Sequence, residues 1–224
     1  MVQPFPTDWR TALVLVPHPD DPEYGSAAAV AKWTSAGKTV RYVLACRGEA
    51  GISGMPPEET ARCREAEQRQ AAAVVGVRDV HFWDFPDSNI RNCPELRDKI
   101  AGTLEELKPD VVLTIYGGRE FAPGAPNQRD HMEFAAAVVA AYDRLVDPPR
   151  WLFSMGPAGT HIDTVDGFID VAIESLAAHE KYLAALDPDT PVVEQARKVL
   201  DMTTPARADT GGRRAVGFIL ERSR

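Results

Sequence analysis

The sequence has little of what marks secreted, membrane-spanning or dinucleotide-binding proteins. Its three cysteines, Cys46, Cys63 and Cys93, are odd in number and form no CxxC pair, so we expect no disulfide framework and a reducing, cytoplasmic environment. It contains no run of about twenty apolar residues, the length that spans a bilayer, and its first residues lack a signal-peptide pattern. No GxGxxG pattern follows the first apolar run, which argues against a dinucleotide-binding fold of the usual kind.

Basic residues are also scarce relative to acidic ones. The chain carries 25 lysines and arginines against 33 aspartates and glutamates, which gives a net charge of -8 and a pI near 5.2. This balance argues against a nucleic-acid partner and against attraction to an anionic membrane surface. It favours a neutral or cationic small molecule over a strongly anionic one. The oligomeric state stays open, a homo-oligomer included.

What the 224 residues do contain is a regular alternation of strand and helix patterns. Several apolar runs are continuous and rich in β-branched residues, which is typical of strands buried on both faces of a sheet. The alternation predicts an α/β fold with a mostly parallel sheet between helical layers, in a single domain over residues 1–224. The predicted strands are 12–16, 40–45, 80–83, 111–115, 151–154 and 215–220, and the predicted helices are 22–36, 58–75, 94–107, 129–145, 167–186 and 190–200.

The segment PHPDDPE at residues 17–23 lies at the junction between the first predicted strand and the first predicted helix. Asp21 suits the N-cap and Pro22 the first helical position. His18 and Asp21 are three residues apart across a tight turn, so both can reach one ion, and imidazole and carboxylate are ordinary zinc ligands. Asp20 then points elsewhere and is free to act as a base. We therefore expect a metal site at the carboxyl end of this strand.

A second polar cluster, NQRDH at residues 127–131, follows a later strand and a loop rich in glycine and proline. We expect the loops 47–57, 86–92 and 117–128 on the same rim of the sheet, because each follows a strand. His131 can then complete a site of two histidines and one carboxylate, the composition of a catalytic zinc. Alone, His131 reads equally well as a surface or capping histidine. His179 is more typical of a core histidine, and His161 is a lone loop histidine.

With these residues in hand, the chain resembles the zinc-dependent de-N-acetylases of the PIG-L/LmbE-like superfamily. The resemblance is carried by an ordered set of segments that spans most of the chain. Its pattern is most similar to the subset that contains bacterial antibiotic-tailoring and GlcNAc deacetylases. The segments are 17–23, RGEAG at 47–51, Arg64-Glu65, FPD at 85–87, KPDVV at 108–112, Asp130-His131 and AAH at 177–179.

The resemblance implies a Rossmann-like three-layer sandwich with its metal, Zn2+ or another divalent ion, at the strand ends. The implied ligands are His18, Asp21 and His131, with Asp20 as general base. The implied reaction removes an N-acyl group, usually acetyl, from an amino sugar or a sugar-containing small molecule. Two alternatives remain: an amidase acting on a thiol-sugar conjugate, and a member that binds its ligand with impaired catalysis.

One position departs from the family pattern. The second motif usually reads His-x-Asp-His, and here its first position is Gln128, which cannot titrate. Asn127, four residues before His131, fits the antibiotic-tailoring subset. We expect His161 or His179 to supply the missing acid or hydrogen-bond donor.

Family position also suggests roles for the remaining polar residues. Asp130 is expected to orient a site histidine through a hydrogen bond. Arg64 and Asp87 are the expected substrate contacts, together with Asn127 and Gln128.

Overall fold

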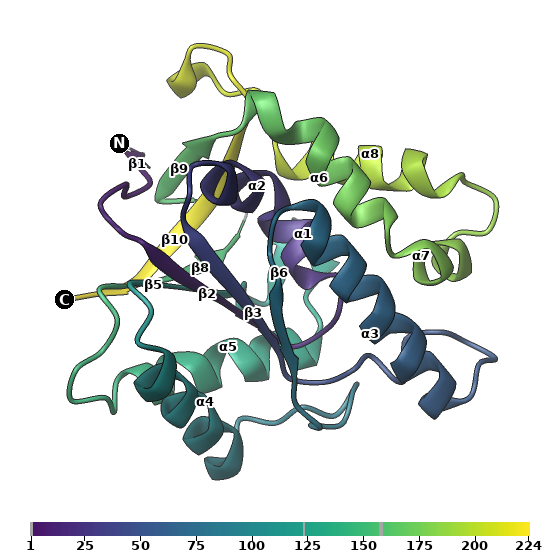
Figure 1. Ribbon diagram of the computed structural model, residues 1–224, viewed down its shortest axis with the longest axis horizontal. Helices are drawn as coiled ribbons and strands as arrows, with labels where there is room; N and C mark the ends of the chain where they lie inside the picture. The colour runs from purple at the N-terminus through teal and green to yellow at the C-terminus, as the bar shows by residue number, and fades with distance from the viewer. Residues whose placement is uncertain (1, 123, 157–158) are drawn as a thin grey trace.

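The computed structural model describes residues 2–122, 124–156 and 159–224. These residues form a central eight-stranded sheet with helices on both faces (Figure 1), which confirms the predicted α/β sandwich with a mostly parallel sheet. The strand order is β1-β9-β10-β8-β5-β2-β3-β4. The strands are β1 (Gln3–Pro4), β2 (Thr11–Val16), β3 (Thr39–Leu44), β4 (Asp79–Phe82), β5 (Val111–Ile115), β8 (Trp151–Met155), β9 (His161–Thr164) and β10 (Ala215–Ser223).

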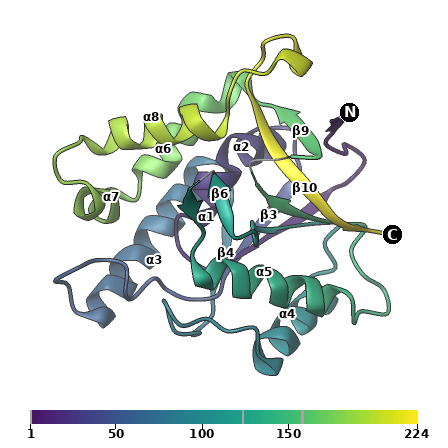
Figure 2. The same cartoon turned by 180° about the vertical axis from the view of Figure 1, so that it is seen from behind.

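The strands β2, β3, β4, β5 and β8 run parallel, and β10 is antiparallel to both β8 and β9. Helices α4 and α5 pack together on one side of the sheet, and α2, α3, α6 and α8 form the layer on the other side (Figures 1 and 2). The helices are α1 (Asp21–Gly25), α2 (Ala27–Ser35), α3 (Pro57–Val74), α4 (Pro94–Leu107), α5 (Arg129–Tyr142), α6 (Ile169–Ala177), α7 (Glu180–Leu186) and α8 (Val192–Thr203).

The central strand β2 explains why the site lies where it does. Its residues from 12 to 16 are all buried, as are all five residues of β5, because helices cover both faces. Parallel strands end at one rim, so the turns after β2, β3, β4 and β5 gather there. Of the helices in the described ranges, none combines the length and apolar character needed to cross a membrane.

Two predicted helices are each interrupted. The predicted helix 22–36 breaks at Ser26, where φ is -146° and the Oγ donates to the carbonyl of Pro22. The predicted helix 167–186 breaks at Ala178 and His179, and His179 precedes α7. The other predicted elements agree within three residues at each end. Four short strands were not predicted: β1, β9 and the two strands of a small hairpin, β6 (Glu120–Ala122) and β7 (Ala125–Pro126). Each has four residues or fewer and no marked apolar run.

Asp110 ties the start of β5 to the start of β2. Its Oδ2 accepts hydrogen bonds from the backbone N–H of Arg10 (2.8 Å) and of Thr11 (2.9 Å), and from Thr11 Oγ1 (3.2 Å). Burial alone would raise the pKa of this carboxyl, but these hydrogen bonds outweigh burial and hold the pKa of Asp110 below its ordinary value. The ionised form therefore stabilises the fold.

Replacing Asp110 by asparagine is expected to lower the free energy of unfolding at pH 7 by about 1–2 kcal/mol, because charged hydrogen bonds become neutral ones. A lowered folded-state pKa means that the stabilisation is complete above the unfolded-state pKa, about 3.9, and is lost as the pH falls through the folded-state value. Urea titrations from pH 7 to pH 3 should show the difference closing below about pH 4. Glu105→Gln, an exposed acid on α4, controls for the loss of one charge. A difference that persists in acid would contradict this account.

Candidate metal centre and catalytic site

The turn between β2 and α1 carries the first part of the site. Asp20, rather than the predicted Asp21, occupies the position before the helix, and Asp21 is the first helical residue. Asp21 does not cap because its carboxylate folds back onto the turn, where Oδ2 accepts the backbone N–H of His18 at 2.8 Å. Asp20 has φ of +87°, a region that aspartate enters more readily than most residues but still at a cost. The two carboxylates therefore leave the turn in different directions.

His18, Asp21 and His131 form one cluster, as the two motifs predicted. His18 Nδ1 lies 3.4 Å from Asp21 Oδ2, and His131 Nε2 lies 3.2 Å from Asp21 Oδ1. One donor atom from each residue lies within 4.8 Å of the other two. His131 belongs to the first turn of α5, so the ends of β2 and β5 bring the three side chains together. The cluster has the donor composition of a catalytic zinc site.

The surroundings of His131 show that a cation fits the cluster. Asn127 Nδ2 donates to the carbonyls of Tyr116 and Gly118, both at 2.8 Å, so its Oδ1 must face the His131 ring. Nδ1–H of His131 donates to that oxygen at 3.0 Å, which leaves Nε2 with a lone pair. Nε2 is buried and finds no hydrogen-bond partner among the described residues. A lone pair that faces the Asp21 carboxylate requires a positive ion or a proton between them.

His18 is surrounded by carboxylates in the same way. Its Nε2 lies 3.3 Å from Asp130 Oδ2 and 3.4 Å from Asp87 Oδ1. Burial acts to lower the pKa of His18, but the hydrogen bonds and charges of Asp130, Asp21 and Asp87 raise it to about 10. Three carboxylates around one imidazole strongly favour positive charge at this position. Asp130 is placed to accept from Nε2–H and to turn Nδ1 toward Asp21, the orienting role expected of it.

The two adjacent aspartates are driven in opposite directions. Burial raises the pKa of Asp20 to about 6, against the opposing charge of Arg64. Burial would also raise the pKa of Asp21, but His131 and His18 hold it well below its ordinary range. Asp21 is thus suited to bind a cation and Asp20 to exchange a proton, as a ligand and a base must be.

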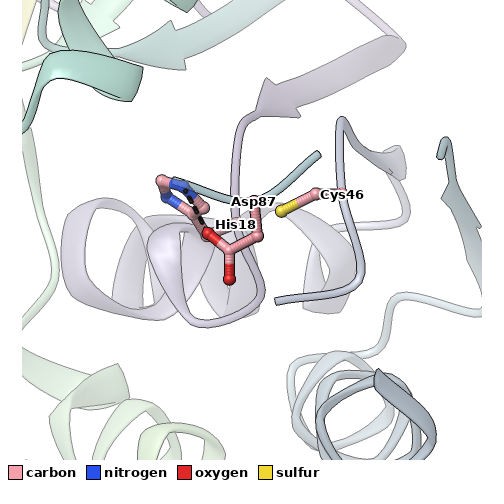
Figure 3. A group of neighbouring side chains, drawn as sticks. All are labelled: His18, Cys46 and Asp87. Atoms are coloured by element: carbon pink, nitrogen blue, oxygen red, sulfur yellow. Dashed lines mark ion pairs between the residues drawn. The ribbon is translucent and has the colours of Figure 1, made fainter. Parts of the chain in front are cut away.

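A competing donor set shares His18. Cys46 and Asp87 also offer atoms within 4.8 Å of His18, and Figure 3 shows the Asp87 carboxylate facing the imidazole with the Cys46 sulfur close by. Cys46 Sγ already donates to the carbonyl of Pro17 at 3.3 Å and accepts the N–H of Gly48 at 3.4 Å. Burial raises the pKa of this thiol well above its ordinary value, whereas a metal ligand must be a thiolate. The cluster with His131 is the better metal site.

Arg64 lies at the site but not as an open substrate contact. It is 3% exposed, and its Nη2 donates to the carbonyl of Pro19 (2.7 Å) and to Asp20 Oδ1 (3.3 Å). Its guanidinium stacks on the ring of Tyr182, 3.9 Å from the centroid. The expectation of a substrate contact is therefore corrected: Arg64 is a buried partner of the Asp20 turn.

The glycines of the segment 47–51 make room for this arginine. A Cβ at Gly51 would lie 2.3 Å from Arg64 Nη1, and one at Gly48 would lie 2.5 Å from the same atom. Gly48 also has φ of +70°, which favours glycine. The close approach of the backbone to the Arg64 side chain therefore explains the glycines of this segment.

Two of the other predicted site residues, Asp87 and Asn127, contact a histidine of the cluster. Asp87 reaches His18 and is anchored by Ala50 N–H (2.9 Å). Asn127 is half-buried and its Oδ1 bonds the His131 ring, whereas Gln128 is exposed at the start of α5. Gln128 is therefore a neighbour of the cluster in the sequence, and its side chain is exposed.

The two later histidines do not reach the reacting atoms. His161 lies on β9, and β10, β8 and β5 separate β9 from β2, a distance of about 19 Å at about 4.8 Å per strand. It packs against Phe153 in an edge-to-face contact. His179 is fully buried, and its Nε2 lies 3.2 Å from Glu23 Oε2. Neither position supports the expected acid or donor for substrate, which corrects that expectation.

No role in the site was predicted for Glu23, Gln68 or Tyr182. Gln68 lies one helical turn after Arg64 on α3, so both face the turn after β2. Buried polar residues at i and i+4 on one helix are a signal that could have identified this pair. Glu23 stood in the first motif, but its partner His179 is 156 residues away, and no local pattern links them.

Fold and site together define a class: an α/β protein with the ligand composition of a catalytic metal centre at the carboxyl ends of its strands. The profile of the family described as GlcNAc-PI de-N-acetylase, PIG-L, matches residues 13–142, more than half of the chain. The chain belongs to this family, which confirms the resemblance.

Individual relatives agree with this membership. A protein of Bacillus anthracis described as a probable N-acetyl-alpha-D-glucosaminyl L-malate deacetylase 2 is 28% identical over 214 residues, covering 87% of this chain and 89% of that protein. The diacetylchitobiose deacetylase of Thermococcus kodakarensis is 31% identical over 113 residues, 50% of this chain and 42% of that protein. The N,N'-diacetylchitobiose deacetylase structure from Pyrococcus horikoshii superposes with a TM-score of 0.84, covering 95% of this chain and 84% of that chain at 18% identity, and so shows the fold.

Replacing Asn127 by leucine is expected to weaken zinc affinity about 10- to 100-fold, the usual effect of removing a partner that orients a ligating histidine. The change removes the oxygen that holds His131 Nδ1–H and leaves all three ligands in place. Competition titration of zinc against a chromophoric chelator measures the affinity. Gln128→Leu is the matched control, since its side chain is exposed beside the same helix end, and it should bind zinc as the wild type does. Equal affinities in all three proteins would contradict the assignment of Asn127.

Proposed function

We propose that this protein is a metal-dependent hydrolase that removes an acetyl group from an N-acetylated amino sugar or sugar conjugate. The observation that carries the proposal is the buried Nε2 of His131 lying 3.2 Å from Asp21 Oδ1, with Asp20 next in the chain and turned toward Arg64. The names of the relatives support the substrate class, since they describe deacetylases of GlcNAc-malate and diacetylchitobiose. Zinc is the metal we propose, and a cytoplasmic location is proposed with it.

The residues divide the chemistry between them. His18, Asp21 and His131 would hold the divalent ion, which supplies Lewis acidity toward the amide carbonyl and toward water. Asp20 takes a proton from the attacking water as the new carbon–oxygen bond forms. When the carbon–nitrogen bond breaks, the same carboxyl returns that proton to the leaving amine. The products are acetate and the free amino sugar.

The return of the proton falls to Asp20 because of where the alternatives lie. Gln128 cannot titrate, His161 lies on a distant strand, and His179 is bonded to Glu23. Arg64 stays on Asp20 Oδ1 throughout, because it is also bound to the carbonyl of Pro19. One buried carboxyl with a fixed cationic neighbour is sufficient for both transfers.

The first test combines metal content with amine release. Wild type is expected to hold about one zinc per chain and to release amine from members of a panel of N-acetylglucosamine, diacetylchitobiose and GlcNAc-malate. Asp20→Asn is expected to keep its zinc and to lose about 100- to 10,000-fold in turnover, the usual contribution of a general base. Elemental analysis and a fluorogenic amine assay give the two readings.

His131→Ala is the complementary variant, because it removes a ligand and leaves Asp20 in place. It should lose both zinc and turnover, and added zinc should restore little of either. Zinc without turnover in the wild type on every substrate would favour a ligand-binding member instead. Absence of zinc from protein purified in its presence would contradict the site itself.

Arg64→Lys is expected to lower kcat and to leave KM within about twofold, since the guanidinium contacts the Asp20 turn and not the substrate. A lysine keeps the charge but cannot donate to Pro19, Asp20 and Gly48 together. Steady-state kinetics on the best substrate of the panel measure both parameters. A rise in KM with unchanged kcat would restore Arg64 to the role of a substrate contact.

A further inference from the structure

A chain of buried polar side chains leads from the catalytic turn into the protein interior. The backbone N–H of Asp20 donates to Gln68 Oε1 at 2.8 Å. Gln68 Nε2 donates to both carboxylate oxygens of Glu23, at 3.1 Å and 3.0 Å. His179 Nε2 lies 3.2 Å from Glu23 Oε2. Gln68, Glu23 and His179 are all 0% exposed, so the metal-dependent chemistry proposed above does not touch them directly.

The backbone N–H of Asp20 fixes the direction of the bonds that Gln68 makes. A backbone N–H can only donate, so the amide oxygen of Gln68 must face Asp20. The amide NH2 of Gln68 then faces Glu23, whose carboxylate accepts from it. An ionised Glu23 can only accept, so we assign Nε2–H of His179 as the donor. Nδ1 of His179 finds no hydrogen-bond partner within the described part of the chain.

Asp20 needs such support because of its backbone. Its φ of +87° is strained for a residue with a Cβ, at a cost of about 1–3 kcal/mol. Two groups hold the peptide that precedes it: Gln68 accepts its N–H and Arg64 donates to the carbonyl of Pro19. The carbonyl of Asp20 accepts from Glu23 N–H and Tyr24 N–H. The direction of the Asp20 carboxyl depends on this conformation.

We infer that Gln68, Glu23 and His179 are positioning residues that hold Asp20 in its strained backbone conformation, and so aim its carboxyl at the reacting water. The inference rests on the proposed hydrolase function for its kinetic consequence. A buried Glu–His pair far from solvent is costly compared with apolar residues of similar size. Its presence directly behind the catalytic turn is therefore explained by positioning.

The decisive variant is Gln68→Met, which keeps length and removes both polar contacts. We expect kcat to fall about 100-fold, because a small displacement of a catalytic group has an effect of this size. KM should stay within about twofold and zinc content unchanged, since no ligand or substrate contact is altered. The Asp20 amide proton should also exchange with solvent faster than in the wild type, which is measured by NMR without substrate.

Gln195→Met is the matched control. Gln195 is 8% exposed, and its Nε2 donates to the carbonyls of Leu183, Asp187 and Thr190, away from the turn. Its loss should lower stability but leave kcat and the exchange of the Asp20 amide as in the wild type. Equal kcat values for Gln68→Met and Gln195→Met would overturn the inference.

Glu23→Gln changes one member of the buried polar network and keeps the size of its side chain. It is the variant to use if Gln68→Met does not fold. The new amide can accept from Gln68 only by turning its NH2 toward His179. His179 Nε2 must then give up its proton and accept, and Nδ1 must carry the proton. Nitrogen NMR of the imidazole should show Nε2 protonated in the wild type and unprotonated in Glu23→Gln. An unchanged Nε2 would overturn the proposed direction of the bonds.

These readings separate this inference from the proposed function. A wild type that releases no amine from the panel would argue against the hydrolase. The amide exchange of Asp20 and the tautomer of His179 would still decide whether the network holds the turn.

Discussion

Negative charge buried at the end of β2 is the constraint on which the site depends. Asp20, Asp21, Glu23, Asp87 and Asp130 are brought together there with almost no exposure to water. An unpaired carboxylate in such a place is too costly to persist. Each therefore has a cation, a backbone N–H or an amide beside it, and the divalent ion that we propose adds the remaining positive charge. Many of the contacts around the turn therefore balance this buried negative charge.

The groups that balance this charge come from elements distant in the sequence. Helix α3 supplies Arg64 and Gln68 from one face, four residues apart, so a single helix neutralises the Asp20 side chain and holds its backbone. Helix α5 supplies Asp130 and His131 from its first turn. Because both helices pack against the sheet, their positions are set by the core and not by the site. The side chains of the site are therefore held in place by the packed layers that surround them.

This division explains what the sequence could predict. The strand β2 and the cluster of His18, Asp21 and His131 were predictable because each lies in a local motif beside a strong apolar run. The positive φ of Asp20 and the burial of Arg64 were not, because they depend on contacts between the turn after β2 and helix α3. His161 was placed wrongly for a related reason: its loop histidine signal is local, while strand order in the sheet is not readable from one sequence.

The same division bears on Gln128, where the chain departs from its family. Gln128 is exposed, and its backbone N–H donates to Asn127 Oδ1 while its side chain takes no part in the buried network. A change at such a position leaves the ligands, the base and their supports where they are. A titrating histidine there would assist the leaving group, but it would not orient Asp20 or the metal ligands. Catalysis that depends on the buried turn can therefore survive this substitution, whereas we expect it to fall when a partner that holds Asp20 in place is lost.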